Sequence, residues 1–354
     1  MAKVLMKGNE AIGAAAINAG CRFFFGYPIT PQNELPEYMS RELPKIGGTY
    51  VQAESEVAAI NMVYGAAGAG ARVMTSSSSP GISLKQEGIS YIAGAELPCV
   101  IVNVVRGGPG LGGIQPAQSD YYQATKGGGH GDYHLLVLAP ANLQEAVELV
   151  EEAFDLADKY RNPVMILADG MIGQIMEPVE FKPYTPYPDL PSKDWATTGT
   201  ADSGGRRRVI NSLFLNPDEL EQHNLHLFQK YATMEKNEVR YELVNCDNAD
   251  IIMVAYGTTS RIVRTAIEQC ERVGIRAGLL RPISLYPYPH KVFDEVIDPP
   301  KAFLCVEMSM GQMIDDVKIA VAGRKPVHFY GRAGGNVPMP EDIVTKVQEI
   351  LKEE

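Results

Sequence analysis

The chain has 354 residues, of which 45% are hydrophobic and 21% are charged. This composition is typical of a folded globular protein and excludes intrinsic disorder, and the length predicts about two domains. Lysine and arginine number 32 against 43 aspartate and glutamate residues, which gives a net charge of −11. Because nucleic acids and anionic membranes attract positive charge, we expect neither a nucleic-acid partner nor a membrane surface as a ligand.

The five cysteines are scattered, and no two of them lie within three residues of each other. This spacing excludes a local CxxC metal or iron–sulfur site and argues against a disulfide framework. The N-terminal segment lacks the apolar stretch of a signal peptide, and no run of about 18 apolar residues occurs anywhere. We therefore expect a cytoplasmic protein without a membrane span.

Residues 1–170 alternate short β-branched segments with alanine-rich segments of helical periodicity. Strands are predicted at residues 22–25, 49–52, 72–75, 98–106, 134–139 and 163–167. Helices are predicted at residues 9–19, 32–42, 55–68, 82–93 and 143–160. Such alternation is typical of a doubly wound α/β fold with a parallel sheet, and we assign it to a first domain at residues 1–180.

A proline-rich stretch interrupts this pattern between Pro178 and Pro191. Proline removes a backbone donor, so the stretch cannot continue a helix or a central strand. We interpret residues 181–244 as a connector that ends in a polar helical segment at 217–241. Alternation then resumes in a smaller α/β domain at 245–354, with strands predicted at 251–256, 276–280, 302–307 and 327–330 and helices at 260–273, 290–297, 311–322 and 340–352.

Gly108, Gly110 and Gly113 form a GxGxxG pattern directly after the predicted strand at 98–106. A dinucleotide-binding fingerprint must open a helix, and the neighbouring prolines Pro109 and Pro116 prevent one here. We therefore reject dinucleotide binding at this site. The segment 106–132 is instead predicted to be a long loop that acts as a lid or a subunit contact.

The segment Gly26–Pro31 follows a predicted strand and precedes a predicted helix. Thr30 could cap that helix with Pro31 at its first position, which is a structural role that needs no ligand and that local chemistry favours. The same place, where a strand end leads into a helix, is also where open α/β sheets bind ligands. There a threonine hydroxyl and free N–H groups would suit a carboxylate, so both interpretations stay open.

Glu56 and Arg106 are two further candidates at predicted strand ends. Glu56 has a structural explanation, because an acid in the first turn of a helix interacts favourably with the helix dipole. Arg106 ends an apolar strand and is a candidate anion clamp, since its forked guanidinium suits a carboxylate. The sequence contains no phosphate-binding loop, no nucleophile elbow and no metal-site motif. It also lacks the GDG-to-asparagine motif that binds thiamine diphosphate through a metal ion.

Several motifs follow one another along nearly the whole chain: Tyr27-Pro28-Ile29-Thr30-Pro31, 53–56 (AESE), 64–71 (YGAAGAGA), 75–84 (TSSSSPGISL), 106–109 (RGGP), 129–132 (GHGD) and 280–283 (LRPI). In this combination the sequence resembles the α subunit of the 2-oxoacid:ferredoxin oxidoreductases. The proline-rich connector and the segment 113–123 (GIQPAQSDYYQ) are similar to the branched-chain, or 2-oxoisovalerate, type. One departure is Ser79, which stands where many relatives have glycine.

The resemblance implies a pyrimidine-type thiamine diphosphate domain at 1–180 and a transketolase C-terminal-like domain at 245–354. Glu56 matches the glutamate that meets the aminopyrimidine of thiamine diphosphate and takes part in catalysis. Thr30 and Arg106 match residues that hold the substrate carboxylate. Tyr27 and Pro28 are expected beside the substrate, and Ile29 beside both substrate and cofactor. No residue of this chain is expected to bind a metal.

The resemblance also implies partners. A β subunit would hold the diphosphate and Mg²⁺ of the cofactor, while iron–sulfur clusters would lie only on partner subunits such as the γ and ferredoxin-like δ subunits. The implied reaction is the oxidative decarboxylation of branched-chain 2-oxoacids to acyl-coenzyme A and CO₂, with ferredoxin as the electron acceptor. Two alternatives stay open, namely the α subunit of a 2-oxoglutarate:ferredoxin oxidoreductase and a non-catalytic scaffold subunit.

Overall fold

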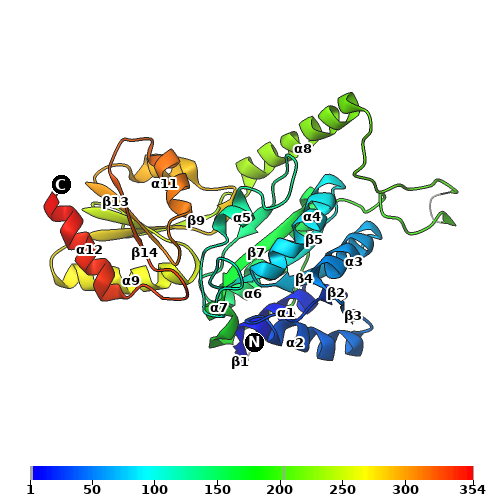
Figure 1. The fold of residues 1–354 in the computed structure, drawn as a ribbon, viewed down its shortest axis with the longest axis horizontal. Coiled ribbons are helices and arrows are strands. Elements are labelled where there is room, and N and C mark those ends of the chain that lie inside the picture. Colours follow the sequence, from blue (N-terminus) through cyan, green and yellow to red (C-terminus); the bar gives the residue numbers. More distant parts are fainter. Residues whose placement is uncertain (1–2, 202–203, 354) are drawn as a thin grey trace.

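The computed structural model describes residues 3–201 and 204–353. The chain forms two α/β units that lie beside each other along the long axis of the molecule, the first coloured blue to green and the second yellow to red (Figure 1). Each unit contains one mainly parallel sheet covered by helices. The predicted α/β class is therefore confirmed.

The sheet of the first unit has seven strands in the order β12-β6-β7-β5-β4-β2-β3. Its strands are β2 (Phe23–Gly26), β3 (Thr49–Gln52), β4 (Val73–Ser77), β5 (Cys99–Val105), β6 (Leu136–Leu138), β7 (Pro163–Asp169) and β12 (Ser284–Tyr286). A separate antiparallel pair consists of β1 (Val4–Lys7) and β8 (Met176–Val179). The central strands β5 and β7 are buried along their whole length, which explains their nearly continuous apolar sequences.

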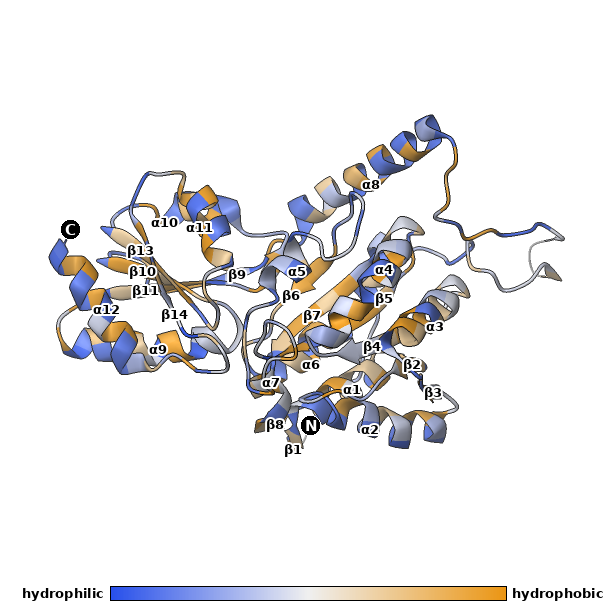
Figure 2. Cartoon of the chain, viewed as in Figure 1, coloured by the Kyte–Doolittle hydropathy of each residue, from blue (hydrophilic) through white to orange (hydrophobic). Residues whose placement is uncertain are grey.

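Helices cover this sheet, and α1 packs against α6 while α3 packs against α4. The helical elements are α1 (Gly8–Asn18), α2 (Glu34–Glu42), the 3₁₀ turn η1 (Leu43–Ile46), α3 (Glu56–Gly68), α4 (Pro80–Gly94), α5 (Tyr121–Thr125), α6 (Leu143–Tyr160) and α7 (Gly170–Gln174). The strands of the sheet are strongly hydrophobic, whereas the helices alternate apolar and polar bands (Figure 2). Burial of the apolar bands against the strands forms the core.

The second unit is built on a five-stranded sheet in the order β14-β13-β10-β11-β9. Its strands are β9 (Tyr241–Val244), β10 (Ile251–Val254), β11 (Ala277–Pro282), β13 (Ala302–Glu307) and β14 (Val327–Gly331). Its helical elements are α9 (Gly257–Arg272), η3 (His290–Val292), α10 (Phe293–Val296), α11 (Met313–Val321) and α12 (Pro340–Glu353). Most of these elements lie within two residues of their predicted positions.

Both sheets end in an antiparallel edge strand that the sequence pattern did not predict. In the second unit β9 pairs antiparallel with β11. In the first sheet the edge strand β12 comes from the second half of the chain and pairs antiparallel with β6. This strand has only three residues and is followed by Pro287 and Pro289, so its local sequence carries no strand periodicity. The two halves are therefore joined by a shared sheet as well as by the connector.

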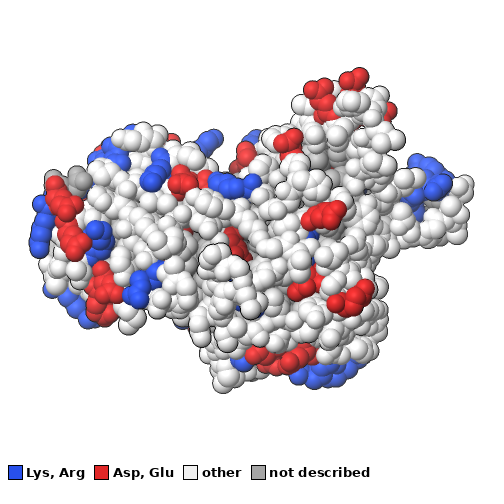
Figure 3. Space-filling model, viewed as in Figure 1, with Lys and Arg blue, Asp and Glu red and all other residues white. Residues whose placement is uncertain are grey.

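The proline-rich connector runs over the first unit and then projects away from it before α8 (Pro217–Asn237) begins (Figure 1). Its first part is held to the surface of α6, where Lys193 forms an ion pair with Asp158 at 2.7 Å and Trp195 stacks under the guanidinium of Arg161. The projecting segment carries basic residues at Arg206–Arg208, and Figure 3 shows a basic patch over this part of the molecule. On its return, α8 lies along the end of α4, with His223 bonded to the Gly94 carbonyl at 2.7 Å.

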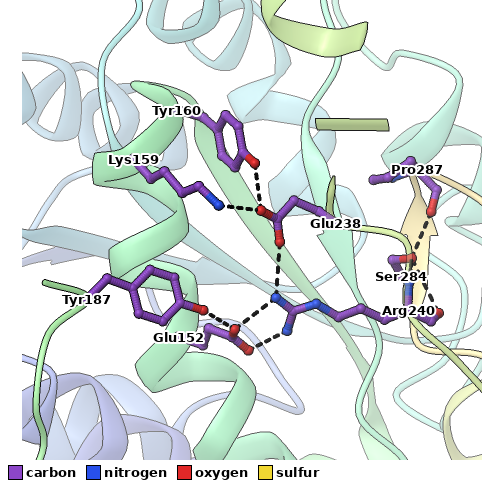
Figure 4. Close-up of polar contacts among 8 residues, drawn as sticks. All are labelled: Glu152, Lys159, Tyr160, Tyr187, Glu238, Arg240, Ser284 and Pro287. Carbon is purple, nitrogen blue, oxygen red and sulfur yellow. Dashed lines mark hydrogen bonds and ion pairs between the residues drawn. The ribbon is translucent and has the colours of Figure 1, made fainter. Parts of the chain in front are cut away.

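Just after α8, a polar network joins the two halves of the chain (Figure 4). Arg240 donates both of its terminal nitrogens to the carboxylate of Glu152 on α6, and one of them also reaches Glu238 at 3.2 Å. The other oxygen of Glu238 accepts from Lys159 at 2.7 Å and from Tyr160 at 2.6 Å. Glu238 is buried, and each of its carboxylate oxygens has a cationic partner, so this network fixes the entry into the second unit.

A second junction lies in the loop 106–132. Gln118 is buried between the units, where its side chain donates to the carbonyl of Tyr256 at 2.9 Å and accepts from Thr259 at 2.7 Å. Tyr121 on α5 donates to the buried carboxylate of Asp316 on α11 at 2.5 Å. The second half of this loop therefore binds the two units of one chain together, and the lid or subunit contact predicted for the loop stays a prediction. None of the helices in the described part of the chain is both long enough and apolar enough to cross a bilayer.

Candidate functional site

The carboxyl ends of three neighbouring strands, β5, β4 and β2, meet at one edge of the first sheet. The loop 27–31 follows β2, the turn 78–81 follows β4, and Arg106 follows β5. Because parallel strands end at the same edge, residues that are far apart in sequence come together here. The candidate residues Thr30 and Arg106 are therefore neighbours, as their positions after predicted strands suggested.

Thr30 lies in a turn and does not cap a helix, so this structural prediction was wrong. Helix α2 begins at Glu34, three residues later than a Thr30 cap would require. The reason is tertiary, because the carbonyl of Pro31 accepts hydrogen bonds at 2.8 Å from both Asn9 and Gln174. With that carbonyl occupied, the turn is held outside the helix. The Thr30 side chain is exposed at the sheet edge.

The other residues of the loop differ in exposure. Tyr27 and Pro28 are exposed, while Ile29 is half-buried. Below them, the fully buried Gln32 accepts from the hydroxyl of Ser76 at 2.5 Å and donates to the carbonyl of Tyr27 at 3.3 Å. Gln32 thus ties the loop to the end of β4 and presents its outer residues at the surface.

Arg106 is buried with 7% of its surface exposed, and its guanidinium spans the site. Nη1 donates to the carbonyl of Thr30 at 2.9 Å, and Nη2 donates to the carbonyl of Leu111 at 3.1 Å. Its Nε is buried without a partner among the described residues. Two of the five N–H donors of this buried cation bond to neutral carbonyls, so its charge and its other donors remain for an anionic ligand.

Ser79 holds the main chain of Arg106 in place. Its hydroxyl donates to the carbonyl of Arg106 at 3.2 Å and accepts from the amide of Arg106 at 3.1 Å. Ser79 adopts a φ of +24°, which is unfavourable for a residue with a side chain. Glycine would relieve this strain but would lose both hydrogen bonds. The strained backbone at Ser79 is therefore offset by two hydrogen bonds that fix the main chain of Arg106.

Glu56 is the first residue of α3, and Ser55 caps that helix by accepting from the amide of Ala58 at 3.1 Å. Only 6% of Glu56 is exposed, yet no hydrogen-bond donor reaches its carboxylate within residues 3–201 and 204–353. Gly81 lies beside the carboxylate, and a Cβ added there would come within 2.8 Å of Oε1 and 2.0 Å of the Ser77 hydroxyl. Glycine at this position keeps space open beside the carboxylate.

Two more polar groups lie at the end of β4. The hydroxyls of Ser77 and Ser78 are buried and make no hydrogen bond with any described residue. Because buried polar groups in folded proteins are nearly always satisfied, such a group of unpartnered atoms indicates a polar ligand. Within the described residues no group of three or more potential ligand side chains could hold a metal ion.

Lys85 is a site residue that the sequence reasoning missed. It lies on α4 with no exposed surface, and its ammonium donates to the hydroxyl of Thr75 at 2.6 Å and to the carbonyl of Ser76 at 3.3 Å. Burial lowers the pKa of Lys85 to about 7, although the negative charge of Glu56 opposes this shift. A signal was available, because Lys85 shares a helical face with Ile82 and Ile89, while its neighbour Leu84 is exposed.

A cleft of about 450 Å³ opens between the two units next to this edge of the sheet. Residues of both units line it, among them Ser79, Gly107, Asp120, Met308 and Gly334. Burial raises the pKa of Asp120, while a hydrogen bond of 2.9 Å from Asn103 opposes the shift. The cleft gives a small molecule access to the strand ends.

Comparison with known proteins places these features in a family. Residues 14–242 match the model of the pyruvate flavodoxin/ferredoxin oxidoreductase family, described as thiamine diphosphate-binding, and residues 249–343 match core domain II of pyruvate:ferredoxin oxidoreductase. A ketoisovalerate oxidoreductase subunit, VorB, of Methanothermobacter thermautotrophicus is 52% identical over 350 residues, which cover 99% of this chain and 98% of that protein.

Solved structures agree with the sequence comparison. A 2-oxoglutarate:ferredoxin oxidoreductase from Magnetococcus marinus, with 2-oxoglutarate, coenzyme A and succinyl-coenzyme A bound, superposes with a TM-score of 0.88 at 29% identity. The match covers 99% of this chain but only 65% of that one. A split-gene transketolase shares the fold, with a TM-score of 0.63 at 15% identity over 98% of both chains. The chain therefore belongs to the pyruvate flavodoxin/ferredoxin oxidoreductase family as an oxidoreductase subunit, as its motifs predicted.

Proposed function

We propose that this chain is the α subunit of a thiamine diphosphate-dependent complex that oxidises branched-chain 2-oxoacids, above all 2-oxoisovalerate, to acyl-coenzyme A and CO₂ while reducing ferredoxin. The observation that carries the proposal is Glu56, a largely buried carboxylate at a strand-to-helix junction whose oxygens accept no hydrogen bond within the described residues. These oxygens are not among the fully enclosed atoms, so they stay accessible to a ligand that donates a hydrogen bond.

The residues around Glu56 fit the aminopyrimidine of thiamine diphosphate. The space left by Gly81 lies beside the carboxylate, and the unpartnered hydroxyls of Ser77 and Ser78 offer further hydrogen bonds. When bound, thiamine diphosphate supplies a nucleophilic carbon that adds to the 2-oxoacid and stabilises the negative charge left by CO₂. The role of Glu56 is to hold a proton against the pyrimidine N1′, with Ile29 beside the ring.

Arg106 and Thr30 would orient the substrate. The guanidinium of Arg106 supplies the positive charge for the 2-oxoacid carboxylate, and the exposed hydroxyl of Thr30 supplies a hydrogen bond beside it. Tyr27 and Pro28 would border the remainder of the substrate. Fixing the carboxylate holds the adjacent carbonyl in line for attack, and such positioning accounts for a large part of the rate of two-substrate reactions.

The same proposal assigns the remaining parts of the reaction to partners. A β subunit would hold the diphosphate and Mg²⁺, and γ and ferredoxin-like δ subunits would carry iron–sulfur clusters and pass electrons to ferredoxin. Residues 1–180 would form the pyrimidine-binding domain, 181–244 the connector with its helix, and 245–354 the second domain. A reducing cytoplasm suits the five cysteines, all of which are unpaired and buried.

A branched-chain substrate is preferred over 2-oxoglutarate because the relative named for ketoisovalerate is 52% identical, whereas the structure named for 2-oxoglutarate is 29% identical. Turnover on 2-oxoisovalerate, 2-oxoglutarate and pyruvate by the reconstituted complex tests this choice. The expected result is the highest kcat/KM on 2-oxoisovalerate. A higher value on 2-oxoglutarate would make the chain the α subunit of that enzyme instead.

The scaffold alternative is tested by Glu56→Gln in the reconstituted complex. Because the amide cannot give a proton to N1′, ferredoxin reduction should fall by about 100-fold or more, in line with the loss of a general acid–base group. Glu54→Gln is the matched control, since Glu54 lies two residues away on the surface and should retain wild-type activity. Unchanged turnover by Glu56→Gln would favour a scaffold.

A further inference from the structure

An exposed apolar segment follows the projecting part of the connector and leads into α8 (Figure 1). Val209, Leu213 and Leu215 are 68%, 65% and 86% exposed, respectively. Several large apolar side chains exposed in one short stretch are typical of a surface that binds a protein or a membrane. The negative charge of the chain disfavours an anionic membrane, so a contact with a protein explains the segment better. The proposed reaction assigns no role to these residues.

Residues 209–215 alternate between two faces. The odd-numbered residues are exposed and the even-numbered ones are half-buried, which is the period of an extended strand. The inner face is anchored to the first unit and to α8. Ile210 lies 3.8 Å from the position that a Cβ on Gly68 would take at the end of α3, and the ring of Phe214 stacks on His223 at 4.7 Å. The outer face is therefore held outward by contacts on the inner one.

The main chain of this segment is also available for pairing. No backbone–backbone hydrogen bond joins residues 209–215 to any other residue of the described ranges 3–201 and 204–353. The side chain of Asn211 accepts from the amide of Leu213 at 2.8 Å and donates to its carbonyl at 2.6 Å. A segment with strand-like alternation, free main-chain groups and outward apolar side chains has the properties of an edge strand, which binds another extended segment.

The two ends of the segment carry opposite charges. The exposed Arg206 and Arg207 precede it, and the exposed Asp218, Glu219 and Glu221 follow it at the start of α8. Figure 3 shows the basic patch over the projecting part of the connector and acidic side chains over the start of α8. If two copies lie antiparallel, the basic end of each faces the acidic end of the other. Such self-complementarity is the property of a closed two-fold interface, in which every contact occurs twice.

We propose that residues 206–221 form a dimerisation arm, through which this chain pairs antiparallel with a second copy about a two-fold axis. An axis close to Ser212 places Val209 of one copy opposite Leu215 of the other and brings Arg206 towards Asp218. Two chains of net charge −11 repel each other at long range, so attraction between opposite charges at the arm selects this contact over others. The inference does not depend on the reaction proposed above.

The test is the mass of the full-length chain in sedimentation equilibrium at low ionic strength, where charge pairs are least screened. The wild type should be a dimer at micromolar concentration. One variant, Arg206→Glu/Arg207→Glu, reverses the basic end, and another, Glu219→Lys/Glu221→Lys, reverses the acidic end. Each variant alone sets like charges opposite each other, so the dissociation constant of its dimer should rise by about 100-fold or more.

An equimolar mixture of the two variants is the decisive sample. In a mixed dimer the glutamates of one arm face the lysines of the other chain, and the arginines of that chain face unchanged acids. Both contacts are then attractive, so the mixture should dimerise with a dissociation constant within about 10-fold of the wild type. A partner of different sequence bound to the same segment would give no such recovery.

Two controls match these variants. Arg272→Glu/Lys352→Glu makes the same change of charge on exposed positions of α9 and α12 and should dimerise as the wild type does. Leu213→Asn tests the apolar face without altering charge and should raise the dissociation constant by about 10-fold. Val273→Asn, at a position that is 54% exposed, is its control and should have no effect on the dimer.

The inference is overturned if the wild type sediments as a monomer, or if the arm variants dimerise as the wild type does. It is equally overturned if both charge variants fold, as judged by circular dichroism, and remain monomeric when mixed. If a charge variant does not fold, Leu213→Asn decides, and an unchanged dissociation constant would then exclude the arm from the interface.

Discussion

Two buried glutamates follow strands in this molecule, one in each unit, and their surroundings are opposite. Glu307 ends β13 without any exposed surface, and its carboxylate accepts from the hydroxyl of Ser309 at 2.8 Å and from the amides of Gln312, Met313 and Ile314 at 3.0–3.2 Å. These bonds satisfy the free N–H groups at the start of α11. Glu56 begins α3 and is 6% exposed, and no donor reaches its carboxylate in the described part of the chain.

The difference separates structural from functional acids. Glu307 stabilises the fold because every oxygen is satisfied within the chain, whereas we propose that Glu56 leaves its hydrogen bonds to a ligand. Sequence position alone does not distinguish them, since both stand at the junction of a strand and a helical segment. The comparison predicts that the two residues respond in opposite ways to substitution.

The largest expected effect on stability comes from Glu307→Gln. The new amide nitrogen faces backbone N–H donors, so at least one donor stays unsatisfied and the free energy of unfolding should fall by about 3 kcal/mol. Urea unfolding followed by circular dichroism measures this loss. Glu349→Gln on the exposed face of α12 is the control, with a change of less than about 0.5 kcal/mol. If the free energy of unfolding falls as little as in the control, Glu307 does not stabilise the fold and its contrast with Glu56 is wrong.

Asp316→Asn tests whether a fully hydrogen-bonded carboxylate also stabilises the junction between the two units. Burial favours a raised pKa for Asp316, but the nearby His290 side chain and hydrogen bonds from Lys126 and Tyr121 outweigh it and hold the pKa below its ordinary value. Its contribution is therefore present above the unfolded pKa of about 3.9 and is lost as the pH falls through the folded value. The free energy of unfolding of the variant should be lower than that of the wild type by about 2 kcal/mol at neutral pH. The difference in free energy of unfolding between the variant and the wild type should become smaller as the pH is lowered. An unchanged difference at pH 3 would contradict this assignment.

Arg106→Lys sharpens the account of the substrate clamp. Lysine keeps the charge but cannot reach the carbonyls of Thr30 and Leu111 with a planar fork. The KM for the 2-oxoacid should rise about 10-fold, a free-energy change of about 1.4 kcal/mol. Binding of thiamine diphosphate, measured by calorimetry, should stay unchanged. Loss of cofactor binding with an unchanged KM would contradict the role of Arg106.

The smallest effect on stability is expected at Ser79. Ser79→Ala keeps the strained backbone and removes both hydrogen bonds to Arg106, so it should lower the free energy of unfolding by about 1–2 kcal/mol. Ser79→Gly also relieves the unfavourable φ, and its loss should be smaller by about 1 kcal/mol. Equal losses for the two variants would mean that the backbone at Ser79 carries no strain.

Much of the fold follows from local pattern. Helix Leu143–Tyr160 and strand Ala302–Glu307 begin and end at the predicted residues, because an amphipathic stripe and an apolar run define them. Strand β12 was missed because its pairing with β6 depends on a contact between residues almost 150 positions apart. The late start of α2 has the same origin, since distant side chains bind the carbonyl of Pro31.

In the candidate site, too, some residues could be predicted from local sequence and others depend on tertiary contacts. Glu56, Thr30 and Arg106 could be named as candidates because each follows a recognisable strand and has a side chain suited to an anion or a proton; their roles stay predictions. Lys85 was missed because lysine is ordinarily exposed, although its place on the apolar face of α4 with Ile82 and Ile89 was a visible signal. The unpartnered state of Glu56 is a three-dimensional property that no local pattern contains.

The central claim, that Glu56 is kept free for a ligand, is tested most directly by the free energy of unfolding of Glu56→Gln, measured by urea denaturation of the cofactor-free chain beside Glu307→Gln. The account predicts that Glu56→Gln leaves the free energy of unfolding unchanged within about 0.5 kcal/mol or raises it, because a neutral amide is easier to bury than an unpartnered carboxylate. A loss as large as that of Glu307→Gln would show that Glu56 is a structural acid and would contradict the account.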